Sequence, residues 1–186
     1  LGLHWHHFNQ PILPPIIDEE PQNVAAQSNQ VLVYLPFEDQ AQVIAMLKPL
    51  TDYQFSVYGP GLSKATLGHI NTHPLAVKPF KIDLASCRFV LSNAGFELIS
   101  EALQLQKRIL VKPLNGQMEQ QSNALALQQL NLATRAERLS SSIIANWLND
   151  NSEKPKVTYP NVASAISDWL LADTPDSINT LSQQLW

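Results

Sequence analysis

The stretch "RFVLSNAGFELISEALQLQKRILVKP", residues 88–113, contains two short apolar runs on either side of a helix-like pattern. Each run contains three consecutive apolar residues, Phe89–Leu91 in "RFVLS" and Ile109–Val111 in "KRILVKP", which is typical of short buried strands. The segment "GFELISEALQLQ" between them has apolar residues at helical spacing. This order of strand, helix and strand predicts a βαβ unit with parallel strands and a right-handed crossover.

The sequence before and after this unit continues the alternation. We predict strands in "QVLVYLPF" (30–37), "YQFSVYG" (53–59) and "HPLAVKPF" (73–80), and helices in "EDQAQVIAMLKPL" (38–50) and "MEQQSNALALQQLNLA" (118–133). The segment "FKIDLASC" (80–87) favours a short helix or a turn. Beyond residue 135 only helix-like segments follow, over 139–150, 161–173 and 177–186. The predicted fold class is α/β, a Rossmann-like doubly wound parallel sheet with C-terminal helices.

We divide the chain into three parts. Residues 1–23 are rich in proline, histidine and aromatic residues and are expected to form a linker leading into the domain. Residues 24–139 are expected to form the Rossmann-like domain, and residues 140–186 the C-terminal helices. Because the chain begins with Leu1, we expect a fragment of a longer protein.

Composition excludes several functional classes. The 186 residues are 45% hydrophobic with a net charge of −4, and the longest basic cluster is Lys107-Arg108, which argues against nucleic-acid binding. No apolar run reaches the length of ~18 residues that a membrane helix needs. The single Cys87 cannot form an internal disulfide and fits a reducing compartment. We expect a cytoplasmic protein, with peripheral attachment to the inner membrane as the alternative.

Two loops follow neighbouring strands and are the candidate site. The first is Ser92–Phe96, where Gly95 permits close backbone approach or a positive φ, and where the following helix offers free N–H groups to a phosphate. Glu97 and Glu101 share one helix face, and the carboxylate of Glu101 can accept two hydrogen bonds from a ribose diol. The alternative is that Asn93 or Ser92 only caps the helix and Glu101 is solvated.

The second loop, "PLNGQMEQQ" (113–121), precedes a helix whose start is crowded with polar side chains. Amide side chains both donate and accept hydrogen bonds, which suits sugar hydroxyls. The alternative is an ordinary polar helix N-terminus. Histidines at His4, His6 and His7 could suggest a metal, but a closed metal site usually takes ligands from separated segments. We expect no metal and no cofactor.

Residues 78–133, above all "SNAGFELISEALQLQKRILVKPLNGQMEQQSNALALQQLNLA", resemble the nucleotide-sugar-binding C-terminal domain of GT-B glycosyltransferases. The pattern is similar to the peptidoglycan N-acetylglucosaminyltransferase, to UDP-glucuronosyltransferase-like enzymes and to prokaryotic glycosyltransferase-like proteins. The resemblance implies metal-independent transfer of a sugar from a nucleoside diphosphate, with UDP expected, to an acceptor held by an N-terminal domain. It also implies that residues 140–186 pack on the domain or cross to that missing N-terminal domain, and that this chain alone is inactive.

The resemblance further implies roles for individual residues. It assigns the ribose hydroxyls to Glu101 and the region of the base to Phe80 and Lys81. It assigns the diphosphate to the loop made of Asn93, Ala94, Gly95 and Phe96. It assigns the donor sugar to Glu119, Gln120 and Gln121.

Departures from the family pattern keep two other functions open. The diphosphate loop carries no evident side-chain cation, so backbone N–H groups and the helix dipole would hold the phosphates. A non-catalytic nucleotide- or partner-binding module would explain this loss. A UDP-sugar 2-epimerase would share the fold and a similar glutamate, although the loop does not supply obvious acid–base residues.

Overall fold

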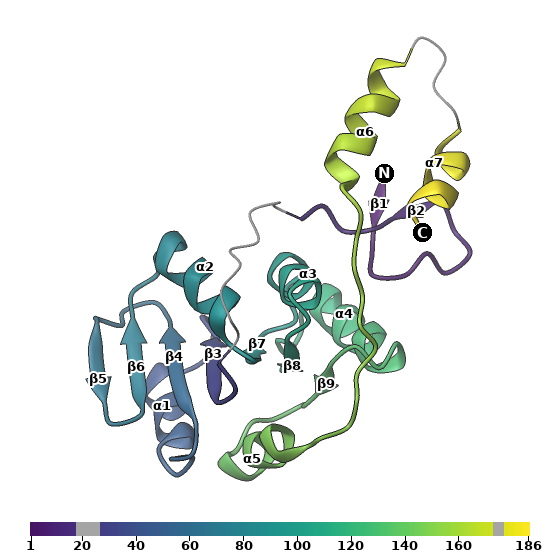
Figure 1. The fold of residues 1–186 in the computed structure, drawn as a ribbon. Helices are drawn as coiled ribbons and strands as arrows, with labels where there is room; N and C mark the ends of the chain where they lie inside the picture. Colours follow the sequence, from purple (N-terminus) through teal and green to yellow (C-terminus); the bar gives the residue numbers. More distant parts are fainter. Residues whose placement is uncertain (18–26, 173–176) are drawn as a thin grey trace.

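The computed structural model describes residues 1–17, 27–172 and 177–186. Its main feature is a seven-stranded sheet in the order β5-β6-β4-β3-β7-β8-β9 (Figure 1). The strands of this sheet are β3 (Gln30–Tyr34), β4 (Gln54–Tyr58), β5 (Ala65–Leu67), β6 (Ile70–His73), β7 (Phe89–Ser92), β8 (Arg108–Val111) and β9 (Thr134–Arg135). All neighbours pair in parallel except β5, which forms an antiparallel edge on β6.

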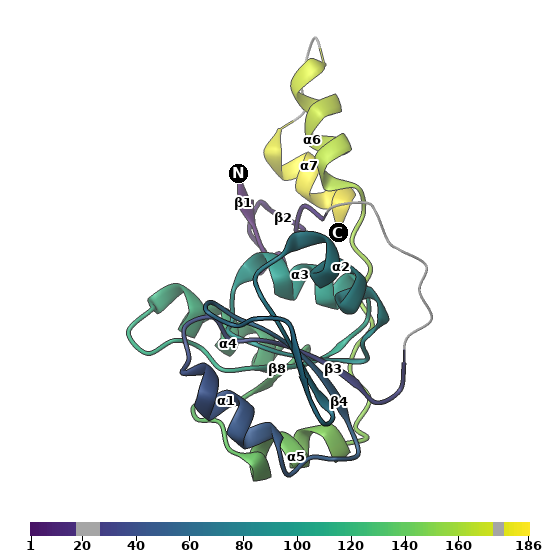
Figure 2. The same cartoon turned by 90° about the vertical axis from the view of Figure 1, so that its left-hand side faces the viewer.

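Helices cover both faces of this sheet, as the turned view shows (Figure 2). One apolar core joins the sheet to α2 (Val77–Ser86), α3 (Phe96–Gln104) and α4 (Met118–Gln129), and includes Leu32, Val90 and Ile109. A second core, on the opposite face, joins the sheet to α1 (Gln40–Leu47) and α5 (Ser141–Asn149), and includes Val31, Leu91 and Trp147. Alternate strand residues point to opposite faces, so this double cover confirms the predicted doubly wound α/β fold.

The predicted strand at 73–80 is wrong, because helix α2 begins within it at Val77. Pro79 stands in the first turn of α2, where backbone N–H groups have no intrahelical acceptor, so the proline costs no helical hydrogen bond. The third parallel strand is β6, which ends at His73. The prediction also missed β5 and β9.

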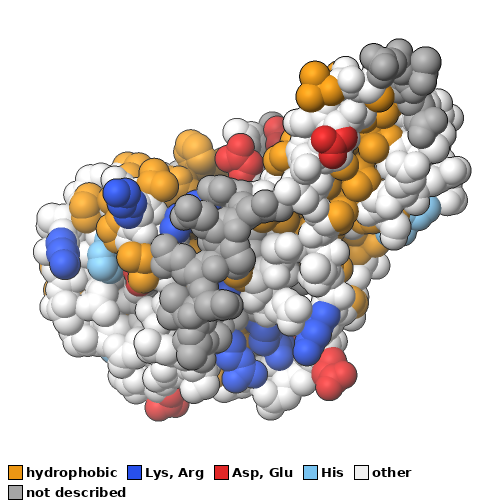
Figure 3. Space-filling view, turned by 45° about the horizontal axis from the view of Figure 1, so that its top comes forward, with side chains coloured by type: hydrophobic (Ala, Val, Ile, Leu, Met, Phe, Trp, Pro, Cys, Tyr) orange, Lys and Arg blue, Asp and Glu red, His pale blue; other side chains and the backbone are white. Residues whose placement is uncertain are grey.

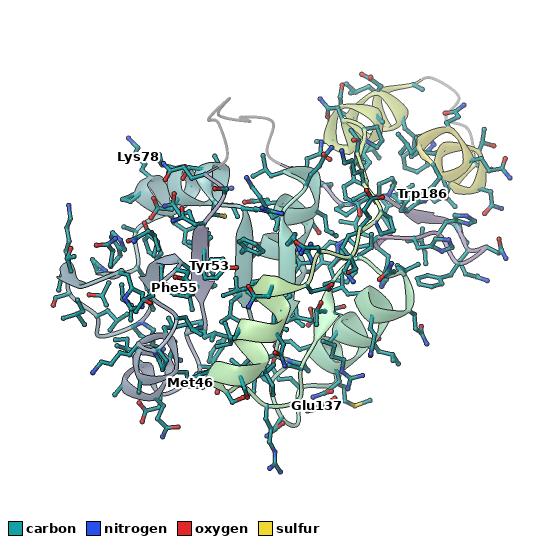
Figure 4. The ribbon with its side chains drawn as sticks, turned by 60° about the horizontal axis from the view of Figure 1, so that its bottom comes forward. Met46, Tyr53, Phe55, Lys78, Glu137 and Trp186 are labelled. Atoms are coloured by element: carbon teal, nitrogen blue, oxygen red, sulfur yellow. The ribbon has the colours of Figure 1, made fainter. Side chains whose placement is uncertain are left out.

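The N- and C-terminal segments form a small lobe beside the sheet domain (Figures 1 and 3). It contains β1 (Gly2–Leu3), β2 (Ile12–Leu13), α6 (Val162–Leu171) and α7 (Ile178–Leu185) around an apolar cluster of Leu13, Val162 and Leu181. Trp186 lies against the N-terminal segment and donates a hydrogen bond from Nε1 to the carbonyl oxygen of Ile12, at 2.7 Å (Figure 4). Trp186 therefore has a partner within this chain.

Among the contacts that attach the lobe and its connection to the sheet domain, two are made to the same helix. Trp5 is buried, stacks on Phe96 with 4.9 Å between ring centroids, and donates from Nε1 to Ser100 Oγ at 2.9 Å. The connection from α5 to α6 is held at Tyr159, whose backbone N–H and carbonyl both bond to the side-chain amide of Gln104. Both contacts are made to α3, the helix that follows the first candidate loop. The predicted domain boundary at residue 23 lies outside the described residues.

We expect Trp147→Ala to lower the free energy of unfolding by about 3–5 kcal/mol, because truncating a buried tryptophan leaves a cavity. Trp147 is 4% exposed and packs edge-to-face on Phe89 in the second core. Urea unfolding followed by circular dichroism measures the change. Ile143→Ala is the matched control, since Ile143 is on the same helix but is 38% exposed. Equal losses in the two variants would contradict this packing.

Candidate functional site

The carboxyl ends of the parallel strands meet at one edge of the sheet, where ligands of doubly wound folds bind. The chain leaves β3 toward β4 on one side, while β7 and β8 lie on the other, so the order of the strands reverses between β3 and β7. The loops after β3, β7 and β8 surround this point. Two features occur there, a pocket and a set of charged pairs.

The pocket has a volume of about 400 Å³ and lies on the side of the edge covered by α2 and α3. Its floor includes Tyr34 and Tyr58, the last residues of β3 and β4. Helix α2 contributes Phe80, whose ring makes edge-to-face contacts with both tyrosines, at centroid distances of 5.3 and 5.1 Å. This aromatic wall suits a flat ring such as a nucleobase.

Lys81 and Glu101 form the polar side of the pocket. Their side chains come from α2 and α3, and Lys81 Nζ donates to Glu101 Oε1 at 2.5 Å. The side chains are 37% and 22% exposed, so the pair is partly accessible to solvent. Glu97 also lines the pocket, one turn before Glu101, which confirms that the two glutamates share a face. The structure thus brings together Phe80, Lys81 and Glu101, although Glu101 already has a cationic partner.

Tyr58 has a polar contact behind the pocket. Its hydroxyl donates to Asp83 Oδ2 at 2.8 Å, and its ring stacks on His73. Burial, together with the hydrogen bond to Asp83 and the charge of its carboxylate, raises the pKa of the Tyr58 hydroxyl above its ordinary value. The neutral hydroxyl therefore anchors β4 to α2 and stays a hydrogen-bond donor at physiological pH.

The first candidate loop differs in detail from the prediction. Gly95 is the N-cap of α3 with a φ of −72°, so a positive φ is not used there. Among the described residues no side chain caps α3: Ser92 Oγ donates to the carbonyl of Asn93, and Asn93 Nδ2 donates to the carbonyl of Lys112. The alternative in which Ser92 or Asn93 caps the helix is therefore wrong. The N–H groups in the first turn of α3 have no side-chain acceptor within residues 1–17, 27–172 and 177–186, and they can bind an anion.

Neighbours hold the rest of this loop firmly. Ala94 is buried, and its carbonyl accepts from Asn123 Nδ2 of α4 at 3.0 Å. Phe96 stacks on Trp5 of the N-terminal lobe. Asn93 is 6% exposed, and its Oδ1 has no partner within the described chain. The loop is thus preorganised by α4 and by the lobe.

In the second candidate loop, most of the predicted polar side chains serve the loop itself. Gln120 Oε1 accepts from the N–H of Leu114 at 3.1 Å, and Gln121 Nε2 donates to the carbonyl of Leu114 at 3.2 Å. Gln121 Oε1 also accepts from Arg135. Glu119 is exposed in the first turn of α4. None of these three residues lines the pocket described above.

An ion pair between Lys112 and Glu38 stands at the same edge and was not anticipated from the sequence. Lys112 follows β8 and Glu38 follows β3, and Lys112 Nζ lies 2.5 Å from Glu38 Oε1. The available signal was the place of Glu38 directly after the predicted strand 30–37 and of Lys112 near the end of the predicted strand 107–113. The pair itself joins positions 74 residues apart, which no local pattern predicts.

The N-terminal histidines do not converge on this edge. His6 and His7 stack on each other and approach Trp186, and each accepts a backbone N–H two residues along the chain. Burial and the charge of His6 lower the pKa of His4. Within residues 1–17, 27–172 and 177–186, no group of three or more His, Cys, Asp or Glu side chains could hold a metal ion. No helix in these ranges is long and apolar enough to cross a membrane.

Comparison with known proteins gives the family. A protein-family model described as glycosyl transferase family 1 matches residues 7–151 of this chain. No curated protein matches the chain significantly. Solved structures with a similar fold include the glycotransferase of kitacinnamycin, with a TM-score of 0.57 and 16% identity over 75% of this chain and 41% of that chain.

Two other solved structures share the fold. ALG13, solved by NMR, has a TM-score of 0.51 and 15% identity over 83% of this chain and 98% of that chain. The glycosyltransferase VinC, solved in complex with DTDP, has a TM-score of 0.52 and 11% identity over 94% of this chain and 42% of that chain. At these identities the likeness shows the fold alone, that of GT-B glycosyltransferases. The chain spans about two fifths of the length of the kitacinnamycin enzyme and of VinC.

We expect Tyr58→Phe to destabilise the chain by about 1 kcal/mol at neutral pH, because Asp83 loses a hydrogen-bond donor. Tyr159→Phe is the control and should cost little, since the buried Tyr159 hydroxyl has no hydrogen-bond partner in the part of the chain that the structure describes. Burial raises the pKa of Tyr159 as well. Both hydroxyls resist ionisation in the folded state only, so wild-type stability should fall as pH rises above about 10. Urea unfolding across pH measures this fall, which each variant should reduce. A fall as steep in both variants as in wild type would count against these shifts.

Proposed function

The chain belongs to glycosyl transferase family 1, and on this premise we propose that it is the donor-binding half of a metal-independent glycosyltransferase. The donor is a nucleoside diphosphate sugar, with UDP as the expected nucleotide. The observation that carries the proposal is the pocket in which an aromatic wall at Phe80 faces the Lys81–Glu101 pair, beside the uncapped first turn of α3. Base, ribose and phosphates of one nucleotide need these three environments next to each other.

In this proposal the base lies on the ring of Phe80, near the backbone of Lys81. Glu101 accepts hydrogen bonds from the ribose hydroxyls, for which it shares or exchanges its contact with Lys81 Nζ. A carboxylate can accept several hydrogen bonds at once, so one Nζ contact leaves capacity for a diol. Glu97 also lines the pocket but is exposed, so its charge is solvated and needs no buried partner.

The diphosphate is proposed to lie at the loop of Asn93, Ala94, Gly95 and Phe96, against the N–H groups of α3. When the bond from the sugar to the diphosphate breaks, negative charge grows on the leaving phosphate. Preorganised N–H donors and the positive end of the helix dipole stabilise that charge without a metal. The contacts of Ala94 with Asn123 and of Phe96 with Trp5 hold these donors in place.

The donor sugar is proposed to lie toward the second loop. Glu119 is exposed there and can accept from sugar hydroxyls, while Gln120 and Gln121 shape the loop through their bonds to Leu114. The acceptor and the residue that removes its proton are assigned to a separate N-terminal domain of the same protein. We accordingly propose that this chain binds donor but does not complete transfer alone.

A non-catalytic nucleotide- or partner-binding module is the second candidate. One observation favours it: the carboxylate of Glu101 is already paired with Lys81. An enzyme and a module both bind nucleotide, but only the enzyme consumes a nucleotide sugar when its acceptor domain is present.

We expect calorimetric titration of this chain to show binding of UDP in preference to GDP, TDP and UMP. Glu101→Ala should weaken UDP binding about tenfold or more, the usual effect of losing hydrogen bonds to a charged group. Lys81→Met is the matched control, because it breaks the same ion pair but keeps the carboxylate, and it should leave UDP affinity equal or higher. Equal losses in both variants would mean that the ion pair, and not a ribose contact, matters.

The ribose contact has its own test. UDP lacking the ribose 2′- and 3′-hydroxyls should bind wild type more weakly than UDP does, and should bind the Glu101→Ala variant no more weakly than UDP does. If the losses of affinity from removing the hydroxyls and from Glu101→Ala are additive, Glu101 does not contact the ribose hydroxyls. Wild type that is well folded and binds none of the four nucleotides would contradict the donor-binding function.

Activity separates the remaining candidates. We expect this chain alone to release no UDP from UDP-sugars, as measured by a coupled UDP assay, because the acceptor machinery is assigned elsewhere. Release of UDP by the isolated chain would refute the assignment of the acceptor machinery to a separate domain. A protein that includes the N-terminal domain should transfer or hydrolyse the donor, whereas conversion of one UDP-sugar into its epimer without acceptor would indicate an isomerase.

A further inference from the structure

The ion pair of Lys112 and Glu38 bridges the point at which the strand order reverses. Glu38 belongs to the loop after β3 and Lys112 to the end of β8, so their contact crosses the carboxyl end of β7, which lies between those strands. The side chain of Lys112 is only 13% exposed and that of Glu38 only 24%. A charged pair therefore stands largely out of solvent at the place where ligands of this fold class bind.

Neighbouring loops hold both partners by their backbones. The Gln40 amide donates to the carbonyls of Leu35 and Glu38, both at 2.8 Å, and so fixes the turn that carries Glu38. The backbone N–H of Lys112 donates to the carbonyl of Ser92 at 3.0 Å, and its carbonyl accepts from Asn93 Nδ2 at 2.9 Å. Lys112 is thereby tied to the first candidate loop, immediately before the uncapped N-terminus of α3.

Gly59 leaves room for the Gln40 side chain. A Cβ added at this glycine would meet the end of the Gln40 side chain, 2.6 Å from Cδ, so a larger residue here would displace the Gln40 amide. Three loops, after β3, β4 and β7, thus contribute to placing one lysine and one glutamate.

Fold stability alone gives little reason for this arrangement. Removing two charges from water costs free energy that their attraction only partly returns, so a half-buried pair stabilises a fold weakly. Lys112 Nζ can donate three hydrogen bonds, and Glu38 is its acceptor among the described residues. The remaining donors can bind a second anion at this edge.

Other cations at the edge are less suitable. Lys81 pairs with Glu101 inside the nucleotide pocket, and Arg135 pairs with the exposed Glu137 and with Gln121. Lys112 has the least exposed side chain of the three and is the one hydrogen-bonded through its backbone to Asn93.

We propose that Lys112 is an anion-binding residue of this site, contacting the terminal phosphate of a nucleoside diphosphate, and that Glu38 holds its ammonium group in place while no donor is bound. This inference rests on the proposed function and adds to it a side-chain cation that the loop sequence lacks. Because Glu38 would then stand near a diphosphate, its negative charge opposes donor binding and favours release of the product diphosphate.

Titration of the full chain with UDP, UMP and inorganic pyrophosphate tests this assignment. Lys112→Met should weaken UDP and pyrophosphate binding about tenfold to a hundredfold, as expected for a lost charge-assisted hydrogen bond, and change UMP binding much less. Glu38→Gln should tighten UDP binding severalfold and leave UMP binding nearly unchanged. Arg108→Met is the matched control, since it removes a cation and an ion pair at the opposite end of the same strand β8, and it should leave the affinity for UDP unchanged.

A double variant, Glu38→Gln with Lys112→Met, guards against misfolding, because it removes both charges and leaves no unpaired carboxylate. It should fold like wild type by circular dichroism and show a preference for UDP over UMP that is reduced as in Lys112→Met. The proposal is overturned if the folded double variant keeps the full wild-type preference for UDP over UMP, or if Lys112→Met weakens UDP and UMP equally.

The outcomes also distinguish this inference from the proposed function. UDP binding that depends on Glu101 but not on Lys112 would overturn the anion site alone. Pyrophosphate binding that depends on Lys112 without any nucleotide binding would support the anion site and overturn the nucleotide role. If the folded wild-type chain binds neither nucleotides nor pyrophosphate, both the anion site and the proposed function are overturned.

Discussion

The structure depends on the burial of β7 on both of its faces. All four residues of this strand are buried, and it lies between β3 and β8 in the middle of the parallel sheet. A strand buried on both faces requires helices on both sides, because neither face can be left to water. Helices α2, α3 and α4 cover one face of the sheet, and α1 and α5 cover the other. Their connections bring the loops after β3, β7 and β8 together at one edge.

Charge balance at that edge is the second constraint. Lys81, Lys112 and Arg135 each contact a carboxylate, contributed by Glu101, Glu38 and Glu137 respectively. In each of the first two pairs the partners come from different elements, so the pair also links two loops or helices. An anionic ligand that enters this edge exchanges or shares existing contacts instead of meeting free cations. Such exchange lowers affinity, but it keeps the positively charged groups in position before the ligand arrives.

The lobe formed by the two ends of the chain acts on the site through α3. Trp5 stacks on Phe96 in the first turn of this helix, and its indole N–H binds Ser100 one turn further on. The Gln104 amide, near the end of the same helix, holds the connection to α6 at Tyr159. Helix α3 is thus fixed along its length by segments from both ends of the sequence. The orientation of its N–H groups, on which anion binding depends, therefore rests on contacts far from the loop itself.

The parallel α/β core could be predicted from local sequence patterns, because the apolar runs of residues 30–34, 54–58, 89–92 and 108–111 and the helical spacing of 96–104 are local properties. It also placed Phe80, Lys81 and Glu101 in one region, through resemblance, and the structure brings these three into one pocket. Local pattern failed at 73–80, where the proline in the first turn of α2 looks like a helix breaker but interrupts no hydrogen bond. The residues' roles in binding stay predictions.

The contacts between residues far apart in the sequence follow from the three-dimensional fold. It paired Lys81 with Glu101, turned Gln120 and Gln121 back on their own loop, and joined Lys112 to Glu38. The physical reason is that an ion pair depends on two side chains meeting in space, while a sequence pattern records only what neighbours along the chain can do. The crossover connections of the sheet bring the loops together, and the packing of helices on its two faces then selects which charges meet.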